Sequence, residues 1–300
     1  MSIHFQSRAP LAKRAALAAA LVCAASLAHA EAVVGLTSTN ALVSFDTAAP
    51  MNASAPIAIT GLVGVNETIL GIDRRPATDA LLGLGSSGRL YSLNTATGAA
   101  TFMSQISGAT LSGSSFGVDF NPVVDRLRVT SNSGQNLRID VTTGAATVDA
   151  AINGGATSLA ASAYTNNFAG AASTTLYGIS SAADTLYIQN PPNNGTLVSV
   201  GALGVDTVGV VGFDISGLSG LAFASLTNGD TAESSFYSIN LATGSATFIG
   251  TFGIGGNPAL AAPLVGIALS VGVIPEPSTY AMLAAGLLAV GFVSRRRRQG

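Results

Sequence analysis

Three copies of one short pattern constrain the fold of this 300-residue chain more than any other feature. They read LYSLNTATGAATF from Leu90, LRIDVTTGAATV from Leu137 and FYSINLATGSATF from Phe236. Each copy is an alternating strand, an Asn or Asp, a Thr-Gly turn and a second alternating strand, which is the pattern of a β-hairpin. The Asn or Asp can bond the turn backbone, and the glycine accepts a left-handed conformation. The repeats therefore predict an all-β protein built from hairpins.

The repeat extends beyond the hairpins. Asp73 and Pro76 recur as Asp119 and Pro122 after 46 residues without a gap, and this period is the size of one four-stranded propeller blade. Short apolar segments that can begin such units recur along the chain: ILGID from Ile69, FGVDF from Phe116, LAASAY from Leu159, VVGFDI from Val210 and LVGIAL from Leu264. The spacing predicts five units.

The fifth unit has only one strand of its own before the C-terminal tail. The segments AVVGLTSTN, ALVSFDT and APIAITGL near the N-terminus can supply its other three strands. A ring closed in this way leaves no long exposed sheet edges. We therefore expect residues 31–272 to form a five-bladed β-propeller closed by N- and C-terminal strands. The alternative is a β-sandwich or solenoid of the same hairpins, but the regular spacing favours blades.

The N-terminus has the pattern of an export signal. Three basic residues precede an apolar run at residues 15–27, and Ala28 and Ala30 then form the small-x-small pattern of a signal-peptidase site. We expect residues 1–30 to be a signal peptide that signal peptidase removes, so that the mature chain begins at Glu31. Lipoprotein processing is a weaker alternative, because a valine and not a small residue precedes the one cysteine. A buried helix is the other alternative.

The C-terminus carries three ordered elements, which are a Pro-Glu-Pro motif, an apolar run from Tyr280 to Val293, and a cluster of arginines. Fourteen helical residues span about 21 Å, which is marginal against the ~30 Å hydrocarbon core of a bilayer. The arginines are expected to stay on the cytoplasmic side, with the body across the membrane. The residues expected to direct this sorting are Pro275, Glu276, Pro277, Arg295, Arg296, Arg297 and Arg298.

This order of elements, in residues 273–300, resembles the PEP-CTERM sorting signal of Gram-negative bacteria. The resemblance implies exosortase as a processing enzyme, a transient anchor in the inner membrane, and delivery to the cell surface or an exopolysaccharide matrix. An ordinary single-pass anchor is the alternative. The body, in phrases such as GIDRRPATDALLGL and FGVDFNPVVDRLRV, resembles a bacterial domain family of unknown function, which implies no reaction.

Composition excludes several classes of function. Residues 31–274 contain no histidine, cysteine or lysine, which excludes Ser-His-Asp and Cys-His nucleophiles, Schiff-base chemistry and the usual zinc and copper ligands. The same residues hold six arginines and fourteen acids, a net charge of −8, so no nucleic-acid partner is expected. We therefore expect a non-enzymatic binding or structural module; the alternative is a carbohydrate-active enzyme that uses carboxylates alone.

Two groups of residues are candidate sites. Asp73, Asp119 and Asp214 occupy the same place in three expected inner strands, so their carboxylates can converge at one end of the channel. They could bind calcium or act as acid and base on a glycan, or they could simply cap the turns that follow. No other cofactor is expected.

The second group lies in one blade and comprises Asp125, Arg126, Arg128 and Arg138. Alternation places Arg126 and Arg128 on one face of a strand, where Arg138 can join them and clamp a carboxylate or a sulfated sugar. The alternative is a salt-bridged surface. Five tyrosines could stack on sugar rings or pack between blades, namely Tyr91, Tyr164, Tyr177, Tyr187 and Tyr237.

Overall fold

The computed structural model of this protein describes residues 30–271. The predicted signal peptide and the predicted apolar segment from Tyr280 to Val293 lie outside that range. Among the residues described, no helix combines the length and the apolar character that crossing a bilayer requires.

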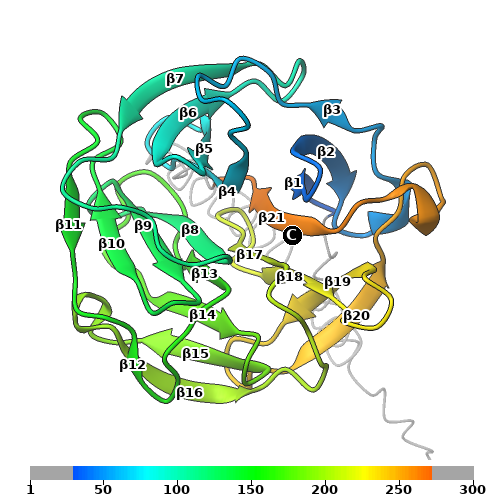
Figure 1. The fold of residues 1–300 in the computed structure, drawn as a ribbon. Helices are drawn as coiled ribbons and strands as arrows, with labels where there is room; N and C mark the ends of the chain where they lie inside the picture. Colours follow the sequence, from blue (N-terminus) through cyan, green and yellow to red (C-terminus); the bar gives the residue numbers. More distant parts are fainter. Residues whose placement is uncertain (1–29, 272–300) are drawn as a thin grey trace, which may run out of the picture. The chain divides into compact units, whose positions relative to one another are not determined.

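The described chain forms five antiparallel sheets arranged in a ring, with one strand of each sheet near the centre (Figure 1). This confirms the five-bladed β-propeller and makes the sandwich and solenoid alternatives wrong. From the centre outward, the first blade is β21 (Leu264–Leu269), β1 (Ala32–Thr37), β2 (Ala41–Asp46) and β3 (Ile57–Ala58).

The second and third blades use consecutive strands. The second is β4 (Ile69–Arg74), β5 (Leu81–Gly85), β6 (Arg89–Leu93) and β7 (Ala100–Gln105). The third is β8 (Phe116–Asn121), β9 (Arg126–Ser131), β10 (Asn136–Ile139) and β11 (Ala146–Val148).

The fourth blade has an extra strand, because the short β12 (Asn153–Gly154) pairs in parallel with its outermost strand. Its other strands are β13 (Ala161–Tyr164), β14 (Leu176–Ser180), β15 (Thr185–Gln189) and β16 (Thr196–Ala202). The fifth blade is β17 (Val211–Ile215), β18 (Ala222–Thr227), β19 (Ser234–Ile239) and β20 (Ala246–Thr251).

Strands from both ends of the described chain close the ring, as predicted. β21 pairs with β1 in antiparallel register, with Leu269 opposite Val33. Both ends of the described chain therefore leave the propeller at the same end of the central axis. The ring closes through backbone hydrogen bonds within one blade, so no unpaired strand edge remains at the junction.

The repeated turns have the predicted geometry. The side chain of Asn94 accepts hydrogen bonds from the amides of Ala96 and Thr97 at 2.9 and 3.0 Å, and Asp140 and Asn240 do the same in their own turns. Gly98, Gly144 and Gly244 have positive φ angles of 71°, 77° and 83°.

Each of these turns also docks on the preceding blade, which the sequence pattern did not predict. The amide of Ser107, just after the second blade, donates to the carbonyl of Gly144 at 2.9 Å, and the amide of Ala146 donates back to Ser107 at 3.0 Å. A Cβ on Gly144 would overlap the carbonyl of Gln105. The glycine is therefore needed for its φ angle and also for this close approach.

Small residues let the inner strands approach one another around the axis. A Cβ on Gly71 would lie 2.6 Å from the side chain of Val118, on the neighbouring blade. The cavity left on the axis among the inner-strand residues is about 10 Å³. That is room for about one water molecule. The middle of the channel of this propeller is therefore filled.

Candidate functional site

The three inner-strand aspartates lie together at one end of the axis. Asp73 on β4, Asp119 on β8 and Asp214 on β17 each place a carboxylate oxygen within 4.8 Å of the others, and each residue is 1% exposed. They converge because the inner strands run in the same direction around the ring, so equivalent positions face the axis at the same height. The predicted convergence is confirmed.

Each aspartate also accepts a hydrogen bond from the inner strand of the next blade. Because the donors are main-chain amides, each bond fixes one blade against its neighbour at the axis. Three of the five blade boundaries are joined in this way. The bonds run from the amide of Phe120 to Asp73 Oδ2 (2.7 Å), from Tyr164 to Asp119 Oδ1 (3.0 Å) and from Leu269 to Asp214 Oδ2 (2.6 Å).

Two of the remaining oxygens are occupied locally. Asp73 Oδ1 accepts from the amide of Arg74 at 2.7 Å, and Asp214 Oδ1 accepts from that of Ile215 at 2.6 Å. Five of the six carboxylate oxygens therefore accept main-chain hydrogen bonds. Within residues 30–271, only the second oxygen of Asp119 has no such donor.

The predicted turn-capping role of these aspartates is wrong. Asn121, two residues after Asp119, caps the turn instead and accepts from the amide of Val123 at 2.9 Å. Ser216, two residues after Asp214, accepts from the amide of Leu218 at 3.1 Å. Asp119 and Asp214 lie two residues too early in the strand to cap the turn, and their side chains accept hydrogen bonds from the next blade instead.

Burial raises the pKa of all three carboxyls. Burial is the largest cause for Asp73 and Asp119, and the charges of the neighbouring aspartates add to it, so both pKa values lie well above 3.8. Burial raises the pKa of Asp214 to about 7, although amide hydrogen bonds from Leu269 and Ile215 oppose the shift. Near pH 7 the carboxyl of Asp214 is therefore partly protonated.

This arrangement favours a structural role, in which the aspartates join neighbouring blades, over calcium binding and over catalysis. Calcium takes about six to eight oxygen ligands, and here most of the oxygens already accept main-chain hydrogen bonds. A glycosidase needs carboxylates that flank a bound sugar, and these are sealed in the core. Calcium binding at Asp73, Asp119 and Asp214 stays a prediction that the hydrogen bonds do not favour.

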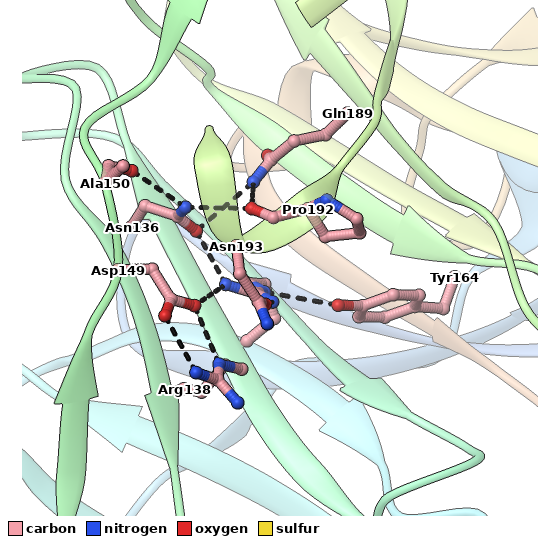
Figure 2. Close-up of polar contacts among 9 residues, drawn as sticks. Asn136, Arg138, Asp149, Ala150, Tyr164, Gln189, Pro192 and Asn193 are labelled. Atoms are coloured by element: carbon pink, nitrogen blue, oxygen red, sulfur yellow. Dashed lines mark hydrogen bonds and ion pairs between the residues drawn. The ribbon is translucent and has the colours of Figure 1, made fainter. Parts of the chain in front are cut away.

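The second candidate group is split between buried and exposed positions. Arg128 is 1% exposed and donates to Asp149 at 2.7 Å, to the side-chain oxygen of Asn136 at 2.8 Å and to that of Asn193 at 2.8 Å. Figure 2 shows Asp149 beside Arg138, which bonds both of its oxygens at 2.7 and 2.8 Å.

The network joins the third blade to the fourth. Tyr164, on β13, bonds the Arg128 side chain at 3.2 Å, and Asn136 donates to the carbonyl of Pro192 at 3.0 Å (Figure 2). The two arginines lower the pKa of Asp149 through hydrogen bonds and charge, against the opposing effect of burial. Arg128 is therefore committed to holding two blades together, and no part of it faces solvent for a ligand.

The other arginines are paired as well. Arg75 forms a two-pronged ion pair with Asp125, Arg126 lies 3.1 Å from the carboxylate of Asp140, and Arg138 shares Asp149 with Arg128. Each of the six arginines between Glu31 and Ile274 makes an ion pair with an acid in the part of the chain that the structure describes. The salt-bridged alternative thus describes this group as the structure places it.

Several buried acids that accept hydrogen bonds within the protein were not indicated by any pattern in the sequence. The side chain of Asp149, just after β11, is 5% exposed. Glu67, just before β4, is buried and accepts from Tyr91 at 2.6 Å, from the amide of Gly64 at 3.0 Å and from Ser87. Glu31 is buried and contacts Ser216.

The tyrosines pack in the protein and offer little ring surface. Tyr91, Tyr164 and Tyr187 are 0%, 1% and 4% exposed, so none of the three can stack on a sugar. Tyr177 and Tyr237 are half-buried and pack against the apolar cluster between the fourth and fifth blades. This confirms the packing interpretation for the set.

Comparisons with solved structures find folds with low similarity. One is a protein of unknown function from Bacteroides thetaiotaomicron, 14% identical with a TM-score of 0.48, matched over 73% of this chain and 57% of its own. A putative 6-phosphogluconolactonase from Bacteroides uniformis is 11% identical with a TM-score of 0.39, covering 74% and 82%. PorZ of Porphyromonas gingivalis, a surface component of the type-IX secretion system, is 17% identical with a TM-score of 0.37, covering 73% and 26%.

No curated protein matches this chain. Two family matches account for most of its length. Residues 273–298 match the PEP-CTERM protein-sorting motif, which supports export and processing by exosortase on the way to the cell surface. Residues 41–268, well over half of the chain, match the domain of unknown function DUF4394, and the protein therefore belongs to the DUF4394 family.

Proposed function

We propose that this protein is exported across the inner membrane, sorted by exosortase, and displayed at the cell surface or released into an exopolysaccharide matrix, where it acts as a non-enzymatic binding or structural module. The sorting motif at residues 273–298 supports the route. The filled propeller axis supports the absence of catalysis.

The geometry of the chain ends supports display. The described chain begins beside Val33 and ends beyond Leu269, and these two residues are paired on adjacent strands. The sorting motif begins only a few residues later, at residue 273. The apolar run expected to enter the membrane begins at Tyr280, so ten residues join Leu269 to it, and these span at most ~36 Å at ~3.6 Å per residue. Both described chain ends leave at the face that carries the aspartate cluster, so we expect that face to lie nearer the membrane while the tail is anchored and the opposite face to point outward.

The chemistry of the described residues supports a non-enzymatic role. The single observation that carries this proposal is the aspartate cluster, the one group of three or more candidate acids within the described range that lies close together. Its members are buried and bonded to the main chain, so they contribute to ring stability and cannot reach a polysaccharide.

A paired experiment tests the proposal on the mature chain purified from the producing cell. One arm incubates it with the native exopolysaccharide and measures the release of reducing ends. The other measures how much of the chain stays with the matrix fraction after washing. We expect retention at the surface or in the matrix and no release of reducing ends. Hydrolysis that Asp119→Asn abolishes would contradict the proposal and support a carboxylate-dependent enzyme.

A further inference from the structure

A cavity of about 210 Å³ lies at the outward end of the axis. It is lined by residues at or just before the start of the inner strands, including Ile69 on β4, Phe116 on β8 and Val211 on β17. The aspartate cluster lies three or four residues further along the same strands, or roughly 10–13 Å at ~3.3 Å per residue. The cavity and the cluster are therefore at opposite ends of the propeller.

All five blades contribute to this cavity, as expected of a mouth on the central axis. The second, third and fifth blades are named above, and β21 of the first blade and Ala160, just before β13 of the fourth, complete the lining. Such a site is fixed by the whole ring and does not depend on one mobile loop. It is therefore preorganised, which lowers the ordering cost of binding.

The cavity is lined by both polar and apolar residues and carries no charge. Its lining contains no acid and no base, and polar side chains come from the loops around its rim. Within residues 30–271, no hydrogen-bond partner is present for the hydroxyls of Ser38, Thr68 and Ser115 or for the side-chain nitrogen of Asn40, whose oxygen accepts from the amide of Ile69. These groups can donate to a ligand, and the hydroxyls can also accept.

The lining indicates the class of ligand. Hydroxyl and amide groups above an apolar floor of Phe116 and Val211 match a molecule with hydroxyls on its edge and C–H groups on its face. An anionic ligand has no cation to meet, because every arginine of the propeller is already ion-paired. The volume is below the ~300–1,000 Å³ of sites for drug-sized ligands, so the occupant is a single small unit.

From these observations we propose that the outward mouth of the propeller binds one neutral sugar unit, either free or at the end of a glycan chain. This inference rests on the proposed function and names the ligand class of a binding module. The opening faces away from the membrane-side chain ends, so it stays accessible while the protein is anchored.

Titration of the mature chain tests the proposal, with binding followed by calorimetry and by saturation-transfer NMR. The probes are glucose, mannose, galactose and N-acetylglucosamine, with their methyl glycosides as models of chain ends, and glucuronate and glucosamine as charged comparators. We expect at least one neutral sugar to bind more tightly than either charged comparator by about tenfold or more. If methyl glycosides bind and free sugars do not, the site recognises the ends of glycan chains.

Three variants locate the binding. Thr68→Trp places a large ring at the rim while leaving the main-chain bonds of residue 68 intact, and should weaken binding by at least about tenfold. Ser115→Ala removes one free hydroxyl and should weaken it several-fold. Val65→Trp is the matched control, because Val65 is 92% exposed and does not line the cavity, so binding should be unchanged. Melting temperatures confirm that all three are folded.

The proposal is overturned if none of the four neutral sugars binds at millimolar concentration, if Thr68→Trp binds as well as the parent chain, or if glucuronate binds more tightly than every neutral sugar. These outcomes are separate from the proposed function. A mature chain that is recovered at the surface but binds no sugar refutes this inference alone, whereas an intact chain confined to the cytoplasm refutes the proposed function.

Discussion

At the scale of single residues, Asp119 differs from its two neighbours because only one of its oxygens accepts a main-chain hydrogen bond. Asparagine in its place can keep the bond from the Tyr164 amide and offers an N–H group to the adjacent carboxylates. It also removes one of three charges that oppose one another. The residue that best fits the site near neutral pH is therefore a neutral one.

We predict that Asp119→Asn is at least as stable as the parent chain at about pH 8, where the buried carboxyls are costly to ionise. Asp214→Asn is the matched comparison, since both oxygens of Asp214 accept amide bonds and one acceptor is lost. Thermal melts of the parent chain, Asp119→Asn and Asp214→Asn test this prediction. A large loss of stability in Asp119→Asn, together with calcium-dependent melting of the parent chain alone, would instead support the calcium prediction.

The buried ion pairs at Asp149 give a second prediction at this scale. Asp149→Ala leaves Arg128 buried without its acid, and breaking a buried pair in this way costs about 3–5 kcal/mol. Arg126→Ala breaks the partly exposed pair with Asp140, which should cost less than about 1 kcal/mol. Denaturant unfolding measures both values. Similar losses of unfolding free energy in the two variants would show that the network in Figure 2 contributes no more to stability than a partly exposed ion pair.

At the scale of elements, the hairpins could be predicted in full and their docking could not. The Asn or Asp and the glycine of each turn act on neighbours a few residues away, so their roles can be read from the local pattern. The contact between Gly144 and the strand before Ser107 joins residues from different blades, and a local pattern contains no information about it. The same limit explains why the partner of Arg128 was missed, because Asp149 lies beyond the next two strands, β10 and β11.

The two roles of Gly144 can be separated experimentally. Gly220 also has a positive φ angle, 72°, but a Cβ there has nothing within 4 Å, so Gly220→Ala should cost only the backbone strain of about 1 kcal/mol. Gly144→Ala adds the overlap with the preceding blade and should cost about 1–3 kcal/mol more. Equal losses in equilibrium unfolding would mean that the turn does not pack against its neighbour.

At the scale of the whole molecule, the ring, its closure and the convergence of the aspartates could be predicted from the sequence. The repeat is regular and its last unit has only one strand of its own, and few folds are compatible with both features. The sequence misassigned the role of the aspartates, since a capping side chain and one that bonds the next blade differ by a small displacement along the strand. It also contained no sign that the axis is filled, which depends on how the inner strands pack.

The aspartate cluster should make the whole propeller less stable as the pH rises from acidic to neutral. The pKa of Asp214 is about 7 in the folded state and 3.8 is its ordinary value, so the folded state binds more protons between these values. Stability should therefore fall as the pH rises from about 4 to about 7, by an amount on the order of a few kcal/mol. Below about pH 4, protonation of acids with lowered pKa values, such as Asp149 and Glu67, removes stability again.

Melting temperatures across this range test the prediction, with Asp119→Asn expected to flatten the slope between about pH 5 and pH 8. A parent chain whose stability rises steadily over the same interval would show that the cluster is ionised at no cost, which requires a bound cation or a more open axis.

The central claim is that this propeller works outside the cell after both of its ends have been processed. Mass spectrometry of the chain recovered from each fraction of the producing cell tests it most directly. We predict a surface or matrix form that begins at Glu31 and lacks the cluster of four arginines from Arg295 to Arg298. Recovery of the chain only in the cytoplasm, with Met1 and Arg298 both present, would contradict the account.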